Sequence, residues 1–211
     1  MDNLSAAYYA NARKEIAPFL PVMLDSVFEL GCSEGNTLAW LRDEKGAKTC
    51  HGLEVFPEAA QRAKEKGLDV VIGNVETDGI SFQGQNDLVL CLDVLEHLLN
   101  PWQVLSTVVE SIRPGGSLIV SLPNIAHVSV LLGLILKNDW CYQGAGVLDR
   151  THLRFFTHKT ACELISGAGV KFVKSKPKFS RKTHRNINWL TFGLFERFLA
   201  YQYIYLAVKE K

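Results

Sequence analysis

The sequence has no long apolar run, no secretory leader and no paired cysteine motif. Its longest apolar stretch, residues 128–136, is interrupted by Ser129 and Gly133 and is much shorter than the ~20 residues that span a bilayer. The N-terminal stretch lacks a basic start followed by an apolar segment, which argues against a secretory signal. Five widely spaced cysteines without a CxxC pair indicate reduced thiols, and we expect no metal ion. The expected location is therefore the cytoplasm.

The chain also lacks an excess of charge of either sign. It has 23 lysines and arginines against 22 acidic residues, which gives a formal net charge of +1. A near-neutral chain has no general electrostatic footprint for nucleic acid, so we expect no nucleic-acid partner. Apolar residues make up 47% of the chain and charged residues 21%, as is typical of a globular protein. The 211 residues suffice for one large domain with its own core.

Short apolar runs alternate with helical patterns along most of the chain. Several runs are nearly continuous, which suits strands covered on both faces, and prolines at 57 and 101 suit the first turn of a helix. This alternation predicts a doubly wound, mostly parallel α/β sheet in a single domain of residues 1–211. The predicted strands are residues 26–30, 49–55, 68–73, 86–93, 117–122, 170–176 and 201–210, with a turn at 113–116.

Three segments depart from this alternation. Residues 1–24 are expected to form an N-terminal helical cap. Residues 124–156 form an irregular insertion with one apolar helix, which is either part of the core or a lid over an acceptor pocket. Thr157 is suited to cap the helix that follows the insertion. Residues 177–199 are expected to be a basic loop and an aromatic-rich helix.

The first predicted strand runs into the glycine-containing loop ELGCSEGNT, residues 29–37. Ligands of open α/β sheets bind at the carboxyl ends of the strands, so this loop marks a candidate site. A dinucleotide-binding GxGxxG motif would need glycines at 31, 33 and 36, and the chain has Ser33 and Asn36 there. This departure argues against a nicotinamide oxidoreductase. Taken alone, the loop could equally be a tight turn without a ligand.

Polar side chains follow the next three predicted strands. Glu54 ends the second strand, where an acid can accept hydrogen bonds from both hydroxyls of a ribose. The segment GNVE, residues 73–76, follows the third strand, where a side chain and a backbone amide could read an adenine edge. Asp93, Glu96 and His97 follow the fourth. Each feature could be a solvated strand end or a helix cap, but four polar ends at one rim favour a ligand site.

Together these motifs resemble the class I S-adenosylmethionine-dependent methyltransferases. The chain looks closest to a small bacterial group found with glycosyltransferases of polysaccharide synthesis, and it is more distantly similar to the ubiquinone O-methyltransferase. The resemblance implies a Rossmann-like three-layer sandwich with a seven-stranded, mostly parallel sheet and an antiparallel last strand. The matching segments are FELGCSEGN, GLEVFPEAA, GNVE, DLVLCLDVLEHL, IRPGGSLIVSLPN and LDRTHLRFFT, over roughly residues 25–175, and the last strand also fits.

The resemblance further implies S-adenosylmethionine as the cofactor, S-adenosylhomocysteine as the product, and the residues that hold the cofactor. Glu54 would bind the ribose and Asp93 would close the site. Many related proteins have glycine where this chain has Ser33, a small residue that we expect to be tolerated. A sulfonium cation also suits the acidic rim better than a dinucleotide would. The other implied contacts are Glu29, Gly31, Cys32, Ser33 and Gly35, with Asn74 and Val75 facing the adenine.

The methyl acceptor, a small molecule, is expected under the insertion. A hydroxyl acceptor has a high pKa and benefits from a base that titrates near neutrality, for which histidine is best suited. His127 and His152 are the candidate bases, and Asp149 could orient one of them or pair with a nearby arginine. For each histidine a purely structural hydrogen bond is the alternative. The expected acceptor-side residues are His97, Tyr142, Arg150 and Arg154, with His97 and Tyr142 as weaker candidate bases.

Two other segments have open interpretations. In the N-terminal cap, Tyr9 or Arg13 could reach the carboxylate of the cofactor, or the helix could be plainly amphipathic. Residues 171–185 hold seven basic residues and no acid, and an aromatic-rich segment follows. The region 171–199 is then either a solvated loop with a packed helix or a surface that contacts an anionic membrane.

The sequence therefore predicts a methyltransferase that acts on oxygen of a small or sugar-containing acceptor. The alternatives are N-methylation of a small molecule, a cofactor-binding scaffold without catalysis and, least favoured, a nicotinamide oxidoreductase. The expected assembly is a monomer or a homodimer.

Overall fold

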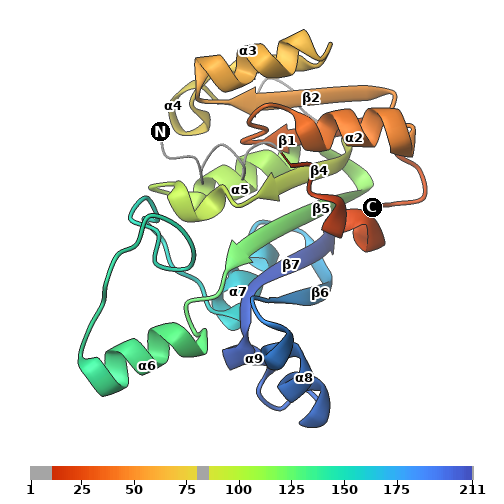
Figure 1. Cartoon of the computed structure of the whole chain (residues 1–211). Helices are drawn as coiled ribbons and strands as arrows, with labels where there is room; N and C mark the ends of the chain where they lie inside the picture. Colours follow the sequence, from red (N-terminus) through yellow and green to blue (C-terminus); the bar gives the residue numbers. More distant parts are fainter. Residues whose placement is uncertain (1–10, 80–85, 211) are drawn as a thin grey trace.

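The computed structural model describes residues 11–79 and 86–210, which contain a seven-stranded sheet in the order β3-β2-β1-β4-β5-β7-β6 (Figure 1). Neighbouring strands are parallel except that β7 runs antiparallel to β5 and β6. The predicted mostly parallel sheet with an antiparallel last strand is confirmed. The strands are β1 (Ser26–Leu30), β2 (Thr49–Glu54), β3 (Asp69–Ile72), β4 (Asn86–Leu92), β5 (Ile112–Pro123), β6 (Lys171–Phe179) and β7 (Ala200–Val208).

Helices cover both faces of the sheet, so the domain has the three layers expected of a Rossmann-like fold (Figure 1). Each layer of helices closes a separate apolar core against the sheet. On one face lie α5 (Pro101–Glu110) and α7 (His158–Gly167); on the other lie the 3-10 helix η1 (Lys14–Phe19), α2 (Asn36–Lys45) and α3 (Pro57–Glu65).

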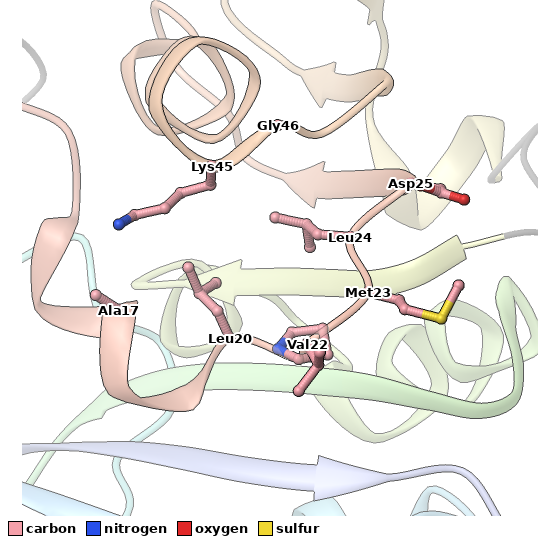
Figure 2. Close-up of a pocket in the computed structure, with 9 residues that line it drawn as sticks. Ala17, Leu20, Val22, Met23, Leu24, Asp25, Lys45 and Gly46 are labelled. Carbon is pink, nitrogen blue, oxygen red and sulfur yellow. The ribbon is translucent and has the colours of Figure 1, made fainter.

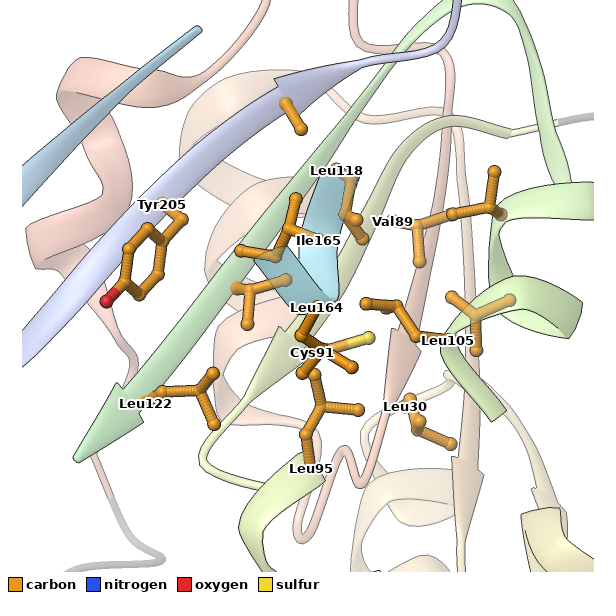
Figure 3. Close-up of a cluster of buried hydrophobic side chains, with 14 of the residues drawn as sticks. Leu30, Val89, Cys91, Leu95, Leu105, Leu118, Leu122, Leu164, Ile165 and Tyr205 are labelled. Carbon is orange, nitrogen blue, oxygen red and sulfur yellow. The ribbon is translucent and has the colours of Figure 1, made fainter. Parts of the chain in front are cut away.

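Strand β4 explains why the central strands are nearly continuous apolar runs. All seven of its residues are buried. Val89 and Cys91 belong to the core on the α5 side, whereas Leu88 and Leu90 belong to the core on the opposite side. Figure 3 shows the first of these cores, where Ile165 of α7 packs over the sheet. Because both faces are covered, each of these side chains contributes ~1.5–3 kcal/mol of transfer free energy.

Local signals set the starts of the helices. Asn100 accepts a hydrogen bond from the backbone N–H of Gln103 at 3.2 Å, and Pro101 occupies the first turn of α5. Thr157 caps α7 as predicted: its hydroxyl accepts from Thr160 N at 3.2 Å, and the Thr160 hydroxyl accepts from Thr157 N at 2.9 Å. Such reciprocal caps satisfy backbone donors that a helix leaves without partners.

The order of the strands places a switch point between β1 and β4. From β1 the chain adds β2 and β3 outward on one side, then returns to add β4 and β5 on the other. In open α/β sheets ligands bind outside the carboxyl ends of the strands at such a point. The loops that follow β1 and β4 are therefore the first place to look for a site.

The ends of two predicted segments are different in the structure. Residues 113–116 fall inside β5, but they bulge out of register, since Asn86 pairs with Ile112 and Leu88 already pairs with Ser117. β6 extends to Phe179, so residues 177–179 are strand rather than loop, and the short helices α8 (Lys182–Leu190) and α9 (Glu196–Leu199) follow.

The helix of the insertion, α6 (Val128–Lys137), stands away from the sheet (Figure 1), and Val130 is its only buried residue. Its interpretation as part of the core is therefore wrong. Of the expected N-terminal cap the structure describes η1 and its flanks, and Tyr9 lies outside the described residues. Within the described part of the chain, no helix is long and apolar enough to cross a membrane.

Candidate active site

The loop after β1 holds three residues in the left-handed region, at φ angles of 68° for Gly31, 49° for Ser33 and 70° for Gly35. A Cβ atom on Gly35 would lie 2.3 Å from Cδ1 of Leu68 and 3.0 Å from Cβ of Ala63, so any other residue would have to displace buried side chains. A non-glycine residue in this region is strained by ~1–2 kcal/mol, so the backbone at Ser33 is strained where a glycine would not be.

Glu54, at the end of β2, holds this loop in place. Its side chain is buried and accepts hydrogen bonds from the backbone N–H groups of Ser33 at 2.7 Å and Phe56 at 2.9 Å. Each carboxylate oxygen can accept further bonds, so these contacts leave room for the predicted ribose hydroxyls. No sequence pattern indicates that Glu54 also anchors the glycine loop.

Glu29, at the carboxyl end of β1, is buried, and its Oε2 has no hydrogen-bond partner within the described residues. Burial raises the pKa of Glu29 to about 8; the Arg13 guanidinium opposes this shift and the Glu54 charge adds to it. Beside it, Cys32 is a buried thiol whose pKa is raised by burial. The rim therefore contains an acid that a cation would ionise.

Asp93 follows β4 and is the centre of a polar cluster. Its carboxylate accepts from Arg13 Nη1 at 2.5 Å, from Ser121 Oγ at 2.6 Å and from the side-chain amide of Gln202. Arg13 also binds Glu15, 2.7 Å from its Nε. The segment before η1 thus reaches the carboxyl edge of the sheet, as an N-terminal cap over the cofactor requires, although Arg13 pairs here with Asp93.

Asn74 and Val75 lie where β3 ends and the short helix α4 (Val75–Asp78) begins. The Asn74 side chain caps this helix by accepting from Glu76 N at 2.9 Å. Val75 packs against the core on the α5 side. Glu76 in turn accepts from the backbone N–H of Asn100 at 2.8 Å and so ties α4 to the loop after β4. Contact of these residues with an adenine stays a prediction.

The end of the insertion returns to the rim beside the 3-10 helix η2 (Leu95–His97). The backbone N–H groups of Leu153 and Arg154 donate to the Glu96 carbonyl at 2.8 and 3.0 Å. This brings the His152 ring within 4.8 Å of the His97 ring, centroid to centroid, at an interplanar angle of 74°. The structure therefore places His97 and His152 together, next to the segment that carries Asp93.

Glu96 lies close to this histidine pair and is influenced by the charge of Asp93, and it was predicted only as one of the polar residues of the rim. Its side chain is buried, and neither carboxylate oxygen accepts a hydrogen bond from another of the described residues. Burial first, and then the Asp93 charge, hold the pKa of Glu96 well above its usual range. Burial likewise lowers the pKa of His152.

His127 occupies a different environment. It precedes α6, accepts from Ser129 N at 3.4 Å through Nδ1, and its ring lies 5.5 Å from that of His184 in α8. Burial, and then the charge of His184, lower the pKa of His127 to about 4. The two candidate bases thus have separate neighbours, and both are neutral at pH 7.

The remaining acceptor-side candidates make mainly structural contacts. Asp149 accepts from the backbone and hydroxyl of Thr151 at 2.8 and 2.6 Å rather than pairing with an arginine. Arg154 donates to the Leu99 carbonyl and lies over the Trp102 ring. Tyr142 and Arg150 are exposed. The Tyr142 ring lies near the rings of Trp140 and Phe155.

A hollow of about 430 Å³ lies at the opposite edge of the sheet (Figure 2). Its lining includes Leu24 and Asp25, which precede β1, and Gly46, which precedes β2. These are the amino ends of the strands, so the hollow is away from the glycine loop and from Asp93. It does not belong to the candidate active site.

The chain matches the family described as methyltransferase domain over residues 6–175. It is 33% identical over 115 residues to the ubiquinone biosynthesis O-methyltransferase of Escherichia coli O127:H6, and the match covers 52% of this chain and 47% of that protein. The chain thus spans about half the length of the curated relatives it matches.

Two solved structures show the same fold. The S-adenosylmethionine-dependent methyltransferase of Mesorhizobium loti has a TM-score of 0.68 at 15% identity, with 95% of this chain and 100% of that one covered. The phosphoethanolamine N-methyltransferase 2 of Haemonchus contortus, in complex with S-adenosyl-L-methionine, has a TM-score of 0.62 at 12% identity, with 93% and 51% covered. Because the family match covers most of its length, the chain belongs to the methyltransferase domain family, and the two solved structures share its fold.

Proposed function

We propose that the protein transfers a methyl group from S-adenosylmethionine to oxygen of a small or sugar-containing acceptor. One observation carries the proposal: a polar pair from the insertion and η2, His152 and His97, lies next to the cofactor rim that holds Asp93. Donor and acceptor groups would then meet at one edge of the sheet, where positioning accelerates the displacement.

The rim suits the charge of the cofactor. S-adenosylmethionine carries a sulfonium and an ammonium group and no pyrophosphate. Glu29 has a buried oxygen that finds no hydrogen-bond partner among the described residues, and a cationic group would satisfy it. The left-handed loop at Gly31 and Gly35 would let the cofactor approach the backbone, while Glu54 would bind the ribose.

The choice of oxygen follows from the acceptor side. A neutral imidazole near pH 7 can take the proton of a hydroxyl, which suits His152, whose pKa is lowered by burial. His127, with a pKa of about 4, is the weaker base of the two. The relative from Escherichia coli is an O-methyltransferase by name, which supports oxygen, whereas the relative from Haemonchus contortus is an N-methyltransferase. A sugar-containing acceptor rests on the resemblance to the group found with glycosyltransferases.

A panel of acceptors tests this function. Catechols, phenols, amines and sugars would be incubated with S-adenosylmethionine, and release of S-adenosylhomocysteine measured. We expect turnover on hydroxyl acceptors. Turnover on amines alone would show that the acceptor atom is nitrogen rather than oxygen. Cofactor binding without turnover on any acceptor would favour the scaffold alternative, and binding of a nicotinamide cofactor instead would favour an oxidoreductase.

Single variants test the assigned roles. Glu54→Ala should weaken cofactor binding by up to ~3 kcal/mol, as loss of hydrogen bonds to a charged group would, and unchanged calorimetric affinity would exclude its ribose role. His127→Ala and His152→Ala should keep that affinity while lowering turnover. Full activity in both variants would show that neither histidine is the base.

We also propose that α8 and the turn after it contact an anionic membrane. Trp189, Phe192 and Leu194 are 75%, 99% and 72% exposed, an arrangement that is costly in water. Exposed basic side chains at Arg181 and Arg185 border them. Aromatic and basic side chains side by side favour the membrane interface.

Part of the predicted basic region is structural. Lys178 forms an ion pair with Glu15 at 2.9 Å, and Lys174 donates to the Pro18 carbonyl at 3.2 Å. These two lysines therefore fasten η1 to β6. The membrane proposal is confined to α8 and residues 191–195.

Co-sedimentation with vesicles decides this point. The chain should pellet with phosphatidylglycerol vesicles and not with phosphatidylcholine, and Phe192→Ser should abolish the binding while Val22→Ser, at an exposed valine outside the patch, should not. Absence of binding would contradict the proposal. A homodimer in sedimentation velocity that Phe192→Ser dissociates would assign the patch to a second copy instead.

A further inference from the structure

One carboxylate and two imidazoles meet at the edge of the candidate active site. The ligand-capable atoms of Glu96, His97 and His152 all lie within 4.8 Å of one another. The first two belong to η2, directly after the switch-point strand β4, and the third comes from the returning end of the insertion.

The carboxylate of this group is buried without a hydrogen bond from another residue of the described part of the chain. Glu96 is 1% exposed, and neither of its oxygens accepts a hydrogen bond from another residue in the described ranges. Buried polar groups are normally paired, and an orphaned one indicates a missing ligand, ion or water. The backbone at Glu96 is fixed by Leu153 and Arg154, so the carboxylate is held toward His152.

The two histidines are oriented as metal ligands are. Nδ1 of His97 lies 3.2 Å from the Thr151 carbonyl, and Nδ1 of His152 lies 3.1 Å from the Val147 carbonyl. A carbonyl can only accept, so each Nδ1 carries the proton and each Nε2 keeps its lone pair. Fixing the tautomer through the far nitrogen is the usual outer-shell arrangement of metal-binding histidines.

We propose that Glu96, His97 and His152 form a binding site for a divalent transition-metal cation such as Zn²⁺, Co²⁺ or Mn²⁺. Two imidazoles and one carboxylate suit this class better than Mg²⁺ or Ca²⁺, which prefer oxygen ligands. Ligand atoms that lie ~2.1 Å from one cation are ~3–4 Å from each other. Small side-chain rotations would therefore bring the three ligand atoms, now within 4.8 Å of one another, to coordinating distance. The sequence-based expectation of no metal considered cysteine spacing, and this site uses no cysteine.

Three protein ligands leave coordination positions open, as in catalytic metal sites. A catalytic use of these open positions rests on the proposed function. An acceptor hydroxyl in an open position would have a lowered pKa and lose its proton to solvent. Its oxygen would form the bond to the methyl carbon as the carbon–sulfur bond breaks, and the electron pair would remain on sulfur. His152 would then be a metal ligand rather than the base.

Titration of the chelator-treated chain with Co²⁺, followed by visible absorption and by displacement with Zn²⁺, tests the site. We expect saturation near one equivalent per chain. Glu96→Gln, His97→Gln and His152→Gln should each weaken binding by at least ~100-fold, since the loss of a direct ligand exceeds that of an outer-shell partner. The matched control is His51→Gln, at a histidine in β2 that binds Asp69, and it should bind like the wild type.

Three results would overturn the site: no saturable binding in the wild type, equal binding in the control and the three variants, or intense near-ultraviolet thiolate bands that assign the cation to a cysteine. Folding of Glu96→Gln is checked by its unfolding temperature, which Zn²⁺ should raise in the wild type and in His51→Gln only. S-adenosylhomocysteine affinity, measured in parallel, should be the same in all variants.

The outcomes also separate the two proposals. Metal binding without methylation of any hydroxyl acceptor would leave the site standing and refute the proposed function. Full turnover by the chelated protein would refute the catalytic role of the cation.

Discussion

Glu29 is expected to make cofactor binding depend on pH and release a proton. This buried carboxyl has a pKa of about 8 because of burial, so at pH 7 it is ~90% protonated in the free protein. A sulfonium or ammonium group beside it favours the carboxylate. If binding returns the pKa to its ordinary 4.5, ~0.9 proton leaves at pH 7, and the affinity rises up to ~10-fold per pH unit between about 5 and 8.

Calorimetry at pH 7 in two buffers of different ionisation enthalpy measures this proton directly. The apparent binding enthalpies should differ by ~0.9 of the difference between the buffers. Glu29→Gln cannot ionise, so its enthalpies should agree between buffers, and its affinity should stay flat over this pH range. Identical enthalpies for the wild type in both buffers would refute the reasoning.

The same group affects folding with a definite sign. The folded pKa of Glu29 lies above the unfolded value, so the folded protein binds the extra proton between about pH 4.5 and 8. The contribution of Glu29 to the free energy of unfolding is therefore present at low pH and declines by up to ~1.4 kcal/mol per unit as the pH rises toward 8. Urea denaturation at pH 6 and 8 should show this decline in the wild type and a smaller one in Glu29→Gln.

Two further changes have expected outcomes. Gly35→Ala should lower the free energy of unfolding by ~2–4 kcal/mol, because its Cβ would lie 2.3 Å from Leu68 Cδ1. Gly46→Ala is the control, since Gly46 also has a positive φ but has open space around it, and it should lower the free energy of unfolding by ~1–2 kcal/mol. Equal losses in urea denaturation would exclude the contact with Leu68 as the cause. Arg13→Ala should lower the free energy of unfolding by ~1–3 kcal/mol, since the Arg13 and Asp93 side chains are only 15% and 9% exposed. An unchanged urea denaturation midpoint would show that this ion pair adds no stability.

Most of the fold could be predicted from the sequence because its signals are local. The apolar run of β4, the prolines at the starts of α3 and α5, and the hydroxyl of Thr157 each act within a few residues. The insertion could not be predicted in the same way. Burial of an apolar helix depends on what it packs against, and α6 contributes only Val130 to the interior.

The candidate site was predictable as a set of positions but not as a set of contacts. Asp93, Glu96 and His97 follow β4 in the sequence, so their presence at the rim follows from topology. That Glu96 is buried depends on the return of residues 153 and 154, more than 50 residues later, whose backbone bonds to its carbonyl. No local pattern carries that information.

The three buried glutamates at the rim differ in one respect that the sequence does not show. Glu54 is satisfied by two backbone N–H groups, so it already has a structural role and can serve a ligand only with its spare lone pairs. In the part of the chain that the structure describes, Glu29 has one oxygen without a hydrogen-bond partner and Glu96 has two. Because an unpaired buried carboxylate is costly, these are the positions at which positive charge should arrive during function. A cationic cofactor group at Glu29 and a metal ion at Glu96, as proposed, would supply that charge at both positions.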